Sequence, residues 1–201
     1  MTDLENFARE LELHIGLPSN ARPFVCEGSP LTCIAFIVGF NAATELRFDF
    51  WKHWRDGYGF DKATWFAEYL AERAARPLKP GRTRRLPVST TRKRLNIVVD
   101  AAAPVRCLET NIHSVASASA AELAVSDRGT AVFDFLLARV RPRVILAHGD
   151  EAVAHLRTRK TGAVLIESAH FASRGGGARG AFTDAEGERL GRSIRQTVEA
   201  R

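Results

Sequence analysis

Apolar residues recur along the chain at the spacings of helices and of buried strands in turn. Leu4, Phe7 and Leu11 fall on one helical face, which predicts an opening helix over residues 3–15. The nearly unbroken apolar run at 31–38 is typical of a strand buried on both faces of a parallel sheet. The start of the chain therefore predicts a helix followed by a buried strand.

The middle of the chain carries capping residues and one loop. Asp49 is expected to cap a short helix, and Asp61 a second one over 62–74. Residues 95–102 have the i, i+3, i+4, i+7 spacing of a helix, although their β-branched run leaves a strand as the alternative. The segment 76–88 contains proline and glycine and is expected to be an exposed loop.

The second half continues the alternation of strands with helices. Short apolar runs predict strands at 105–110, 144–147 and 163–166, and Thr183 is expected to cap a last helix. About four strands alternating with about four helices predict an α/β fold. We expect one domain over residues 1–201, a three-layer αβα fold with a central, mostly parallel four-stranded sheet.

Composition limits the class of protein. The 201 residues are 45% hydrophobic and carry a formal net charge of +6, with a pI near 9.7. This balance suits one well-cored domain and is compatible with a polyanionic partner. No apolar run reaches the roughly 18 residues of a membrane span, and the acidic N-terminus does not resemble a secretory signal.

The cysteines bear on location and on cofactors. Cys26, Cys33 and Cys107 are an odd number and widely spread, which argues against a disulfide framework and against a four-cysteine iron–sulfur site. We therefore expect a protein of the reducing cytoplasm, with no metal and no cofactor.

Three predicted strands end in polar residues. These ends are 39–44, 109–113 and 168–174. In open α/β sheets, ligands bind beyond the carboxyl ends of the strands. The three segments are therefore expected to meet at one ligand site.

The content and order of these segments resemble the uracil-DNA glycosylase superfamily. Residues 39–43 (GFNAA) resemble its first motif, most closely the Gly-Ile-Asn-Pro-Gly form of the mismatch-specific branch. Asn111 is similar to the Asn that reads the base, and 170–174 (HFASR) to the His-Pro-Ser motif and the loop that enters the duplex. Residues 50–52 (FWK) and 144–149 (VILAHG) resemble the connecting sequence.

The resemblance implies roles for individual residues. Asn41 is expected to orient the attacking water, and His170 to donate to the departing base; these are the catalytic candidates. Asn111 is expected to pair with the Watson–Crick edge of a flipped uracil. The other base-binding candidates are Gly39, Phe40, Ala43 and Phe48.

Phe48 is the aromatic expected to stack on the base, because Phe50 and Trp51 have the pattern of core residues. Phe40, Phe50 and Trp54 remain alternatives for this role. Ala43 stands where the fastest branch has a tyrosine wall, which predicts that 5-hydroxymethyluracil is excised along with uracil.

Two segments are expected to contact DNA. Seven basic residues and no acid lie in 79–94; there, Arg92 and Arg94 are expected to bind phosphates. Ser173, Arg174 and Gly175 begin the loop, running to Gly180, that would fill the vacated base stack. A solvated basic segment and a mobile surface loop are the respective alternatives.

Together these patterns predict a monofunctional DNA glycosylase that flips uracil, and C5-modified uracils, and hydrolyses the N-glycosidic bond to leave an abasic site. No lysine accompanies the three motifs, so lyase chemistry is not expected. The expected partner is DNA containing uracil or an abasic site, and the protein is expected to be a monomer. The alternatives are a DNA-binding protein without useful turnover and an unrelated nucleoside or nucleotide hydrolase. His113 and His148 are expected to be structural, with a position at the pocket rim as the alternative.

Overall fold

The computed structural model describes residues 1–43, 46–78, 81, 83–117, 120–175 and 179–200. Three of the segments singled out in the sequence lie partly outside these residues. The missing positions are Thr44 of the polar strand end 39–44, Lys79, Pro80 and Arg82 of the basic segment, and 176–178 of the expected wedge loop.

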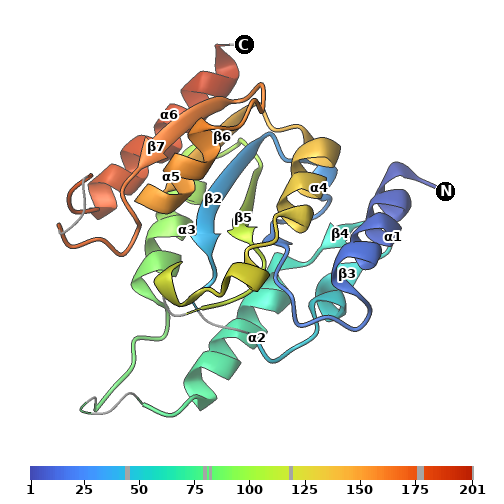
Figure 1. Cartoon of the computed structure of the whole chain (residues 1–201), viewed down its shortest axis with the longest axis horizontal. Helices are drawn as coiled ribbons and strands as arrows, with labels where there is room; N and C mark the ends of the chain where they lie inside the picture. The colour runs from blue at the N-terminus through green and yellow to red at the C-terminus, as the bar shows by residue number, and fades with distance from the viewer. Residues whose placement is uncertain (44–45, 79–80, 82, 118–119, 176–178, 201) are drawn as a thin grey trace.

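A five-stranded sheet runs through the centre of the described chain, in the order β1-β5-β2-β6-β7 (Figure 1). The four longer strands are mutually parallel, as expected, and β1 adds a short antiparallel edge against β5. The expectation of four strands missed β1, because two residues are too short to show a periodic pattern. The strands are β1 (Phe24–Val25), β2 (Ala35–Asn41), β5 (Cys107–His113), β6 (Val144–His148) and β7 (Val164–Ser168).

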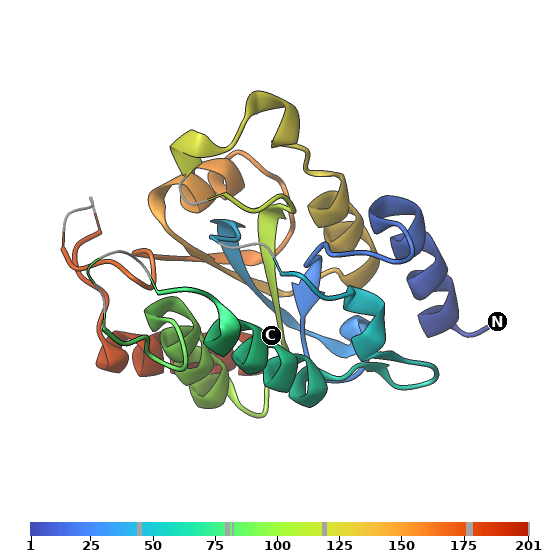
Figure 2. The same ribbon diagram turned by 90° about the horizontal axis from the view of Figure 1, so that it is seen from below.

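Helices cover both faces of this sheet and make three layers, as Figure 2 shows. One layer contains α3 and α6, with α2 beside them, and the other contains α1, α4 and α5. The helices are α1 (Asp3–Ile15), α2 (Lys62–Ala75), α3 (Thr90–Ala102), α4 (Ala131–Val140), α5 (Asp150–Arg157) and α6 (Asp184–Glu199). Short 3₁₀ turns occupy Pro30–Thr32, Phe50–His53, Ala120–Glu122 and Val125–Asp127, and a small hairpin pairs β3 (Trp54–Arg55) with β4 (Gly59–Phe60).

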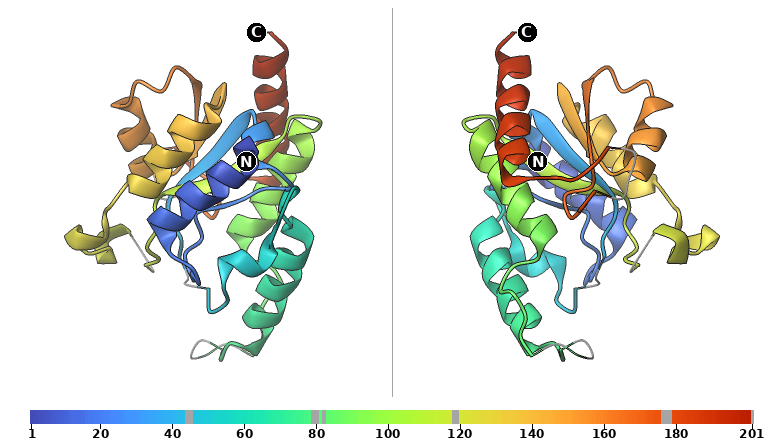
Figure 3. Two further views of the ribbon diagram at one scale, coloured as in Figure 1. Left: turned by 90° about the vertical axis from the view of Figure 1, so that its right-hand side faces the viewer. Right: turned by 90° about the vertical axis from the view of Figure 1, so that its left-hand side faces the viewer.

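The core lies on the two sides of the sheet. Phe36 and Val38 of β2 belong to the cluster under α1, α4 and α5, whereas Ile37 belongs to the cluster under α3 and α6. This alternation follows from the period of two in a strand. Helices α3 and α6 pack against each other (Figure 3), and the close approach requires Gly191, where an added Cβ would lie 2.4 Å from the Val98 carbonyl oxygen.

Most predicted helix starts are confirmed. Asp61 caps α2 by accepting a hydrogen bond from the Thr64 amide at 3.0 Å, and Thr183 caps α6. Residues 95–102 are helical, inside α3, which decides between the two alternatives. Asp49 caps only a 3₁₀ turn, so the helix expected there is wrong in type.

All four parallel strands differ from their predicted bounds by one to four residues, and the largest differences are in β2 and β5. β2 begins at Ala35 because 30–32 form a 3₁₀ turn, and β5 continues through Asn111 to His113 instead of ending at 110. No helix of the described residues is long and apolar enough to cross a membrane.

Candidate functional site

A pocket of about 200 Å³ opens beyond the carboxyl ends of the parallel strands. It is lined from β2, β5, β6 and the segment after β7, and from α2 and α3 on the helical side. Three parallel strands and the turn after a fourth therefore point to one site, which confirms that the polar strand ends meet. The predicted site residues that line it are Asn41, Ala43, Arg92, Asn111 and His170.

Asn111 lies at the floor of the pocket, opposite Gly39 in the β2–β5 register. A Cβ added at Gly39 would lie 2.7 Å from Asn111 Oδ1 and 3.0 Å from His148 Nε2. Glycine is therefore required at 39 because the amide and the imidazole fill the space a side chain would take. The absence of a side chain at Gly39 leaves room for Asn111 and His148 at the floor of the pocket.

Asn41 is the last residue of β2. Its amide nitrogen donates to the Ser117 hydroxyl at 2.7 Å and to the Ser117 carbonyl oxygen at 3.3 Å. These bonds orient the amide and leave Asn41 Oδ1 as the acceptor available to a ligand or a water. An amide oxygen can hold a water by a hydrogen bond, although it cannot take its proton.

His170 follows β7 in an exposed turn and still lines the pocket. Its Nδ1 accepts a hydrogen bond from the Ala172 amide at 3.2 Å, so the neutral ring carries its proton on Nε2. Burial lowers the pKa of His170 below its ordinary value, against an opposing effect of Glu151. The imidazole is therefore a neutral donor at pH 7.

His148, which was expected to be structural, lines the pocket. It is 7% exposed, stacks on Phe171 with ring centroids 4.1 Å apart, and its buried Nδ1 has no hydrogen-bond partner among the described residues. Burial, and then the nearby His170, lower the pKa of His148 to about 3. His113, also expected to be structural, is buried and packs against Phe40 with ring centroids 4.7 Å apart.

The buried His148 predicts an acid-sensitive fold. The unfolded chain protonates this histidine near pH 6.5 and the folded one only near 3, so the unfolded state binds more protons between these values. The contribution of the neutral His148 to the free energy of unfolding is fully present above pH 6.5. Below that pH, the free energy of unfolding falls by up to about 1.4 kcal/mol per pH unit. Urea unfolding from pH 7 to 4 should show a shallower slope for His148→Gln. The exposed His14→Gln should keep the wild-type slope; an unchanged slope in His148→Gln would contradict the assignment.

Arg92 corrects the expectation of an exposed phosphate ligand. Its side chain is buried, bonds through Nη1 to Glu109 Oε2, and lies 5.2 Å from the Trp65 ring centre. Lys62 Nζ contacts the other Glu109 oxygen at 2.8 Å. The basic pattern at 79–94 could not show this, because Glu109 comes from a strand that is distant in the sequence.

The aromatic of the pocket is Tyr69, which the sequence analysis missed. Phe48, the expected stacking residue, is a core residue with its ring 5.4 Å from His53. Tyr69 lines the pocket from α2 and stacks on Trp65 with centroids 5.6 Å apart. The apolar pattern of α2 contains this tyrosine, but only packing decides which way its ring faces. The alternatives Phe40, Phe50 and Trp54 are also outside the pocket lining of the described chain.

Arg94 holds the turn that carries His170. Its Nη1 donates to the Phe171 carbonyl oxygen at 2.6 Å, and its guanidinium lies 5.4 Å from the Phe182 ring centre. Arg94 therefore joins α3 to the segment after β7, which differs from the free phosphate contact expected. The structure supports a positioning role for this side chain.

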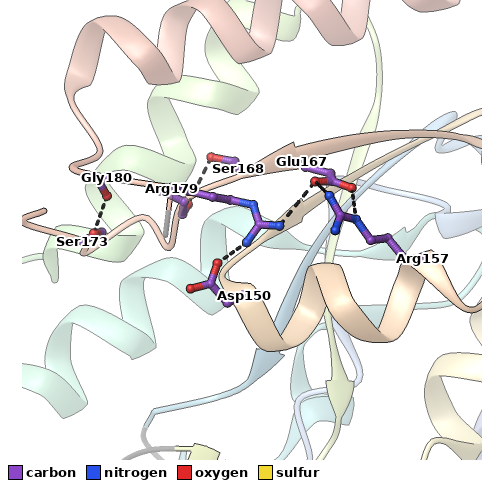
Figure 4. Close-up of polar contacts among 8 residues, drawn as sticks. Asp150, Arg157, Glu167, Ser168, Ser173, Arg179 and Gly180 are labelled. Carbon is purple, nitrogen blue, oxygen red and sulfur yellow. Dashed lines mark hydrogen bonds and ion pairs between the residues drawn. The ribbon is translucent and has the colours of Figure 1, made fainter. Parts of the chain in front are cut away.

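A hydrogen bond and a backbone bridge join the two ends of the expected wedge loop. The Ser173 hydroxyl donates to the Gly180 carbonyl oxygen at 2.7 Å (Figure 4). Arg174 pairs with Ala181 in a single antiparallel bridge. The Ser173 hydroxyl is thus occupied by the chain itself. Arg174 and Gly175 are exposed.

Arg179 ties this loop to the rest of the fold. Its guanidinium pairs with Asp150 at the start of α5 and lies 3.4 Å from Glu167 of β7, which Arg157 also binds at 2.5 Å (Figure 4). Alternating charges thus tie the described part of the loop to β7 and to the start of α5.

Arg179→Ala is expected to raise the hydrogen-exchange rate of the backbone amides at 174–175 and 180–181 severalfold, because the loop loses both carboxylate contacts. Arg157→Ala is the matched control, since it breaks a contact with Glu167 outside the loop. Equal exchange in both variants would show that the ion pairs do not hold the loop.

Comparisons with known proteins assign no family. No protein-family profile matches the chain, and no curated protein matches it. Among the described residues, no group of three His, Cys, Asp or Glu side chains is placed to hold a metal ion. The functional proposal rests on the pocket residues and their geometry.

Proposed function

We propose that this protein is a monofunctional DNA glycosylase that removes uracil from DNA. The observation that carries the proposal is the meeting of Asn41, Asn111 and His170 in one pocket, although they come from three separate strand ends. These are the residues that resemble the three motifs of the uracil-DNA glycosylase superfamily. Their meeting was expected because parallel strands of one sheet end on the same side, and the resemblance supplies the role of each residue.

Asn111 recognises the base in this proposal. Its amide offers one donor and one acceptor, which complement O4 and N3–H of uracil and mismatch the edge of cytosine. Tyr69 supplies an aromatic surface on the helical side of the same pocket. A base flipped from the stack therefore gains both a hydrogen-bonded edge and a surface to lie against.

His170 and Asn41 act on the bond that breaks. A water held by Asn41 Oδ1 attacks C1′, the C1′–N1 bond breaks, and the bonding electrons leave with the base. The neutral Nε2–H of His170 stabilises the departing uracil anion at O2, and the water loses its proton to solvent. Since an amide is no base, stabilisation of the leaving group provides most of the rate enhancement.

A fluorescent oligonucleotide with one uracil tests this function. Incubation with the protein followed by alkali should cleave the strand at the uracil position, in single-stranded or double-stranded DNA. Intact DNA in both contexts would refute the enzyme and leave the alternative of a protein that binds flipped bases without turnover.

Ala43 is expected to widen the substrate range. It lines the pocket with an exposed methyl group, where a tyrosine would press on C5 of the base. We predict that the wild type excises 5-hydroxymethyluracil and that Ala43→Tyr reduces this activity by about 10-fold or more relative to uracil. Single-turnover rates on both oligonucleotides measure the ratio, and an unchanged ratio would place Ala43 away from C5.

The proposed partner is DNA, bound by a monomer in the cytoplasm. The exposed Arg174 and Gly175, beside the pocket, are proposed to contact the duplex. The net charge of +6 favours such a polyanion.

A further inference from the structure

One end of the pocket is cationic. Four arginines line it, whereas Glu109 is the one carboxylate among its described lining residues. Two of the arginines are engaged at the rim, since Arg73 donates to the Leu86 carbonyl oxygen and Arg76 pairs with Glu72. Of the other two, Arg92 is bound to Glu109 through Nη1 only, so Arg22 and the remaining N–H groups of Arg92 are the part that can serve a ligand.

The charges at this inner end do not balance. Glu109 is 4% exposed and is bound by both Arg92 and Lys62. Arg22 is a third cation beside the same carboxylate, and no hydrogen bond or ion pair of Arg22 occurs among the described residues. Three cations thus surround one buried carboxylate, and a guanidinium taken out of water without a counter-charge is costly.

The pKa of Arg22 reflects the cost of this unbalanced charge. Burial, and then repulsion by Arg92, lower the pKa of Arg22 to about 10. The half-buried guanidinium lines the pocket and keeps all five of its N–H groups for a partner there. The negative charge of an anion at this position would offset both causes of the shift.

Polar groups of α3 complete the surroundings. Ser89 and Thr91 line the pocket at the start of this 13-residue helix, where backbone N–H groups point out of the helix. Ser89 uses its oxygen to cap the Arg92 amide at 3.1 Å. The Thr91 hydroxyl and the helix start thus add donors on the side facing the arginines.

We propose that Arg22, Arg92 and Thr91 form a subsite for an oxyanion carried by the ligand. This inference rests on the proposed function for the identity of the ligand, but not for the binding of the anion. The strand order places β1 and Arg22 on one side of Asn111, and β6 and His170 on the other. A base held by Asn111 at O4 and by His170 at O2 turns its C4–C5 edge toward the arginines.

The oxyanion has two possible sources with the same chemistry. One is an acidic substituent at C5 of the base, for which the exposed Ala43 leaves room. The other is a phosphate of the nucleic acid. Guanidinium groups bind both carboxylate and phosphate through paired N–H groups.

Inorganic phosphate tests the subsite without turnover. Isothermal titration should show phosphate binding to the wild type at constant ionic strength, and binding about 10-fold weaker or more for Arg22→Met. Arg9→Met, an exposed arginine of α1, is the matched control and should bind as the wild type does. Arg22→Met should unfold at the same temperature or higher, because it removes an unpaired cation. Equal phosphate binding by Arg22→Met and wild type, or no binding by the wild type, would overturn the proposal.

Oligonucleotides identify the source. Binding of wild type and Arg22→Met is compared on strands with 5-carboxyuracil, with uracil, and with uracil next to a 5′-terminal phosphate. If the 5-carboxyuracil strand binds more tightly than the uracil strand, and this difference is lost in Arg22→Met, the subsite binds a substituent of the base. If the strand with the terminal phosphate shows that behaviour, the subsite binds the backbone. If neither strand binds more tightly than the uracil strand, the assignment of the subsite to an anion carried by the ligand is overturned. Since binding is measured, a failure of the glycosylase proposal leaves this result readable.

Discussion

Asn111→Ala is expected to abolish uracil excision while leaving the fold intact. Asn111 lines the pocket floor and presents both hydrogen-bonding groups of its amide to the base in the proposed complex. A site built around a hydrogen-bonding edge loses on the order of 10²-fold or more when that edge is removed. Single-turnover excision of uracil at saturating protein measures the loss.

The fold should survive this change because the side chain faces a pocket and not the core. The free energy of unfolding should stay within about 1 kcal/mol of the wild type. Asn20→Ala, at an exposed position, is the control and should be fully active. Normal excision by a folded Asn111→Ala protein would show that this residue does not read the base.

Glu109→Gln is expected to be strongly destabilising. The carboxylate is buried and is the shared partner of Arg92 and Lys62, so an amide in its place leaves the buried Arg92 and the half-buried Lys62 without a counter-charge. Breaking a buried ion pair on one side costs about 3–5 kcal/mol. Urea unfolding at pH 7 measures the loss, and Glu199→Gln, on the exposed end of α6, should change stability little.

The same residue predicts a dependence on pH. Burial by itself would raise the pKa of Glu109, but Arg92 and Lys62 hold it below its ordinary value of 4.5. Its contribution to stability is therefore present above about pH 4.5 and is lost as the pH falls through the lowered folded-state value. Glu109→Gln should lack this part of the acid transition. A variant as stable as the wild type at pH 7 would refute the ion cluster.

Local patterns determined most of the secondary structure of this protein. Asp61 and Thr183 cap helices through bonds to residues three positions away, and the periods of apolar residues distinguish helix from strand within a few turns. The polar residues that follow each predicted strand were also recognisable from the local sequence. Parallel strands of one sheet end on the same side, so these residues were expected to lie close together. Asn41, Asn111 and His170 could therefore be expected at one site.

The tertiary structure decided which side chains furnish that site. The sequence pattern led to Phe48 and not to Tyr69, yet packing turns Phe48 into the core and Tyr69 toward the pocket. Arg92 is a buried partner of Glu109 because the tertiary structure brings α3 next to β5. The short edge strand β1 likewise brings Arg22 to the pocket. Burial and ion pairing join residues far apart in the chain, and no local spacing encodes such distances.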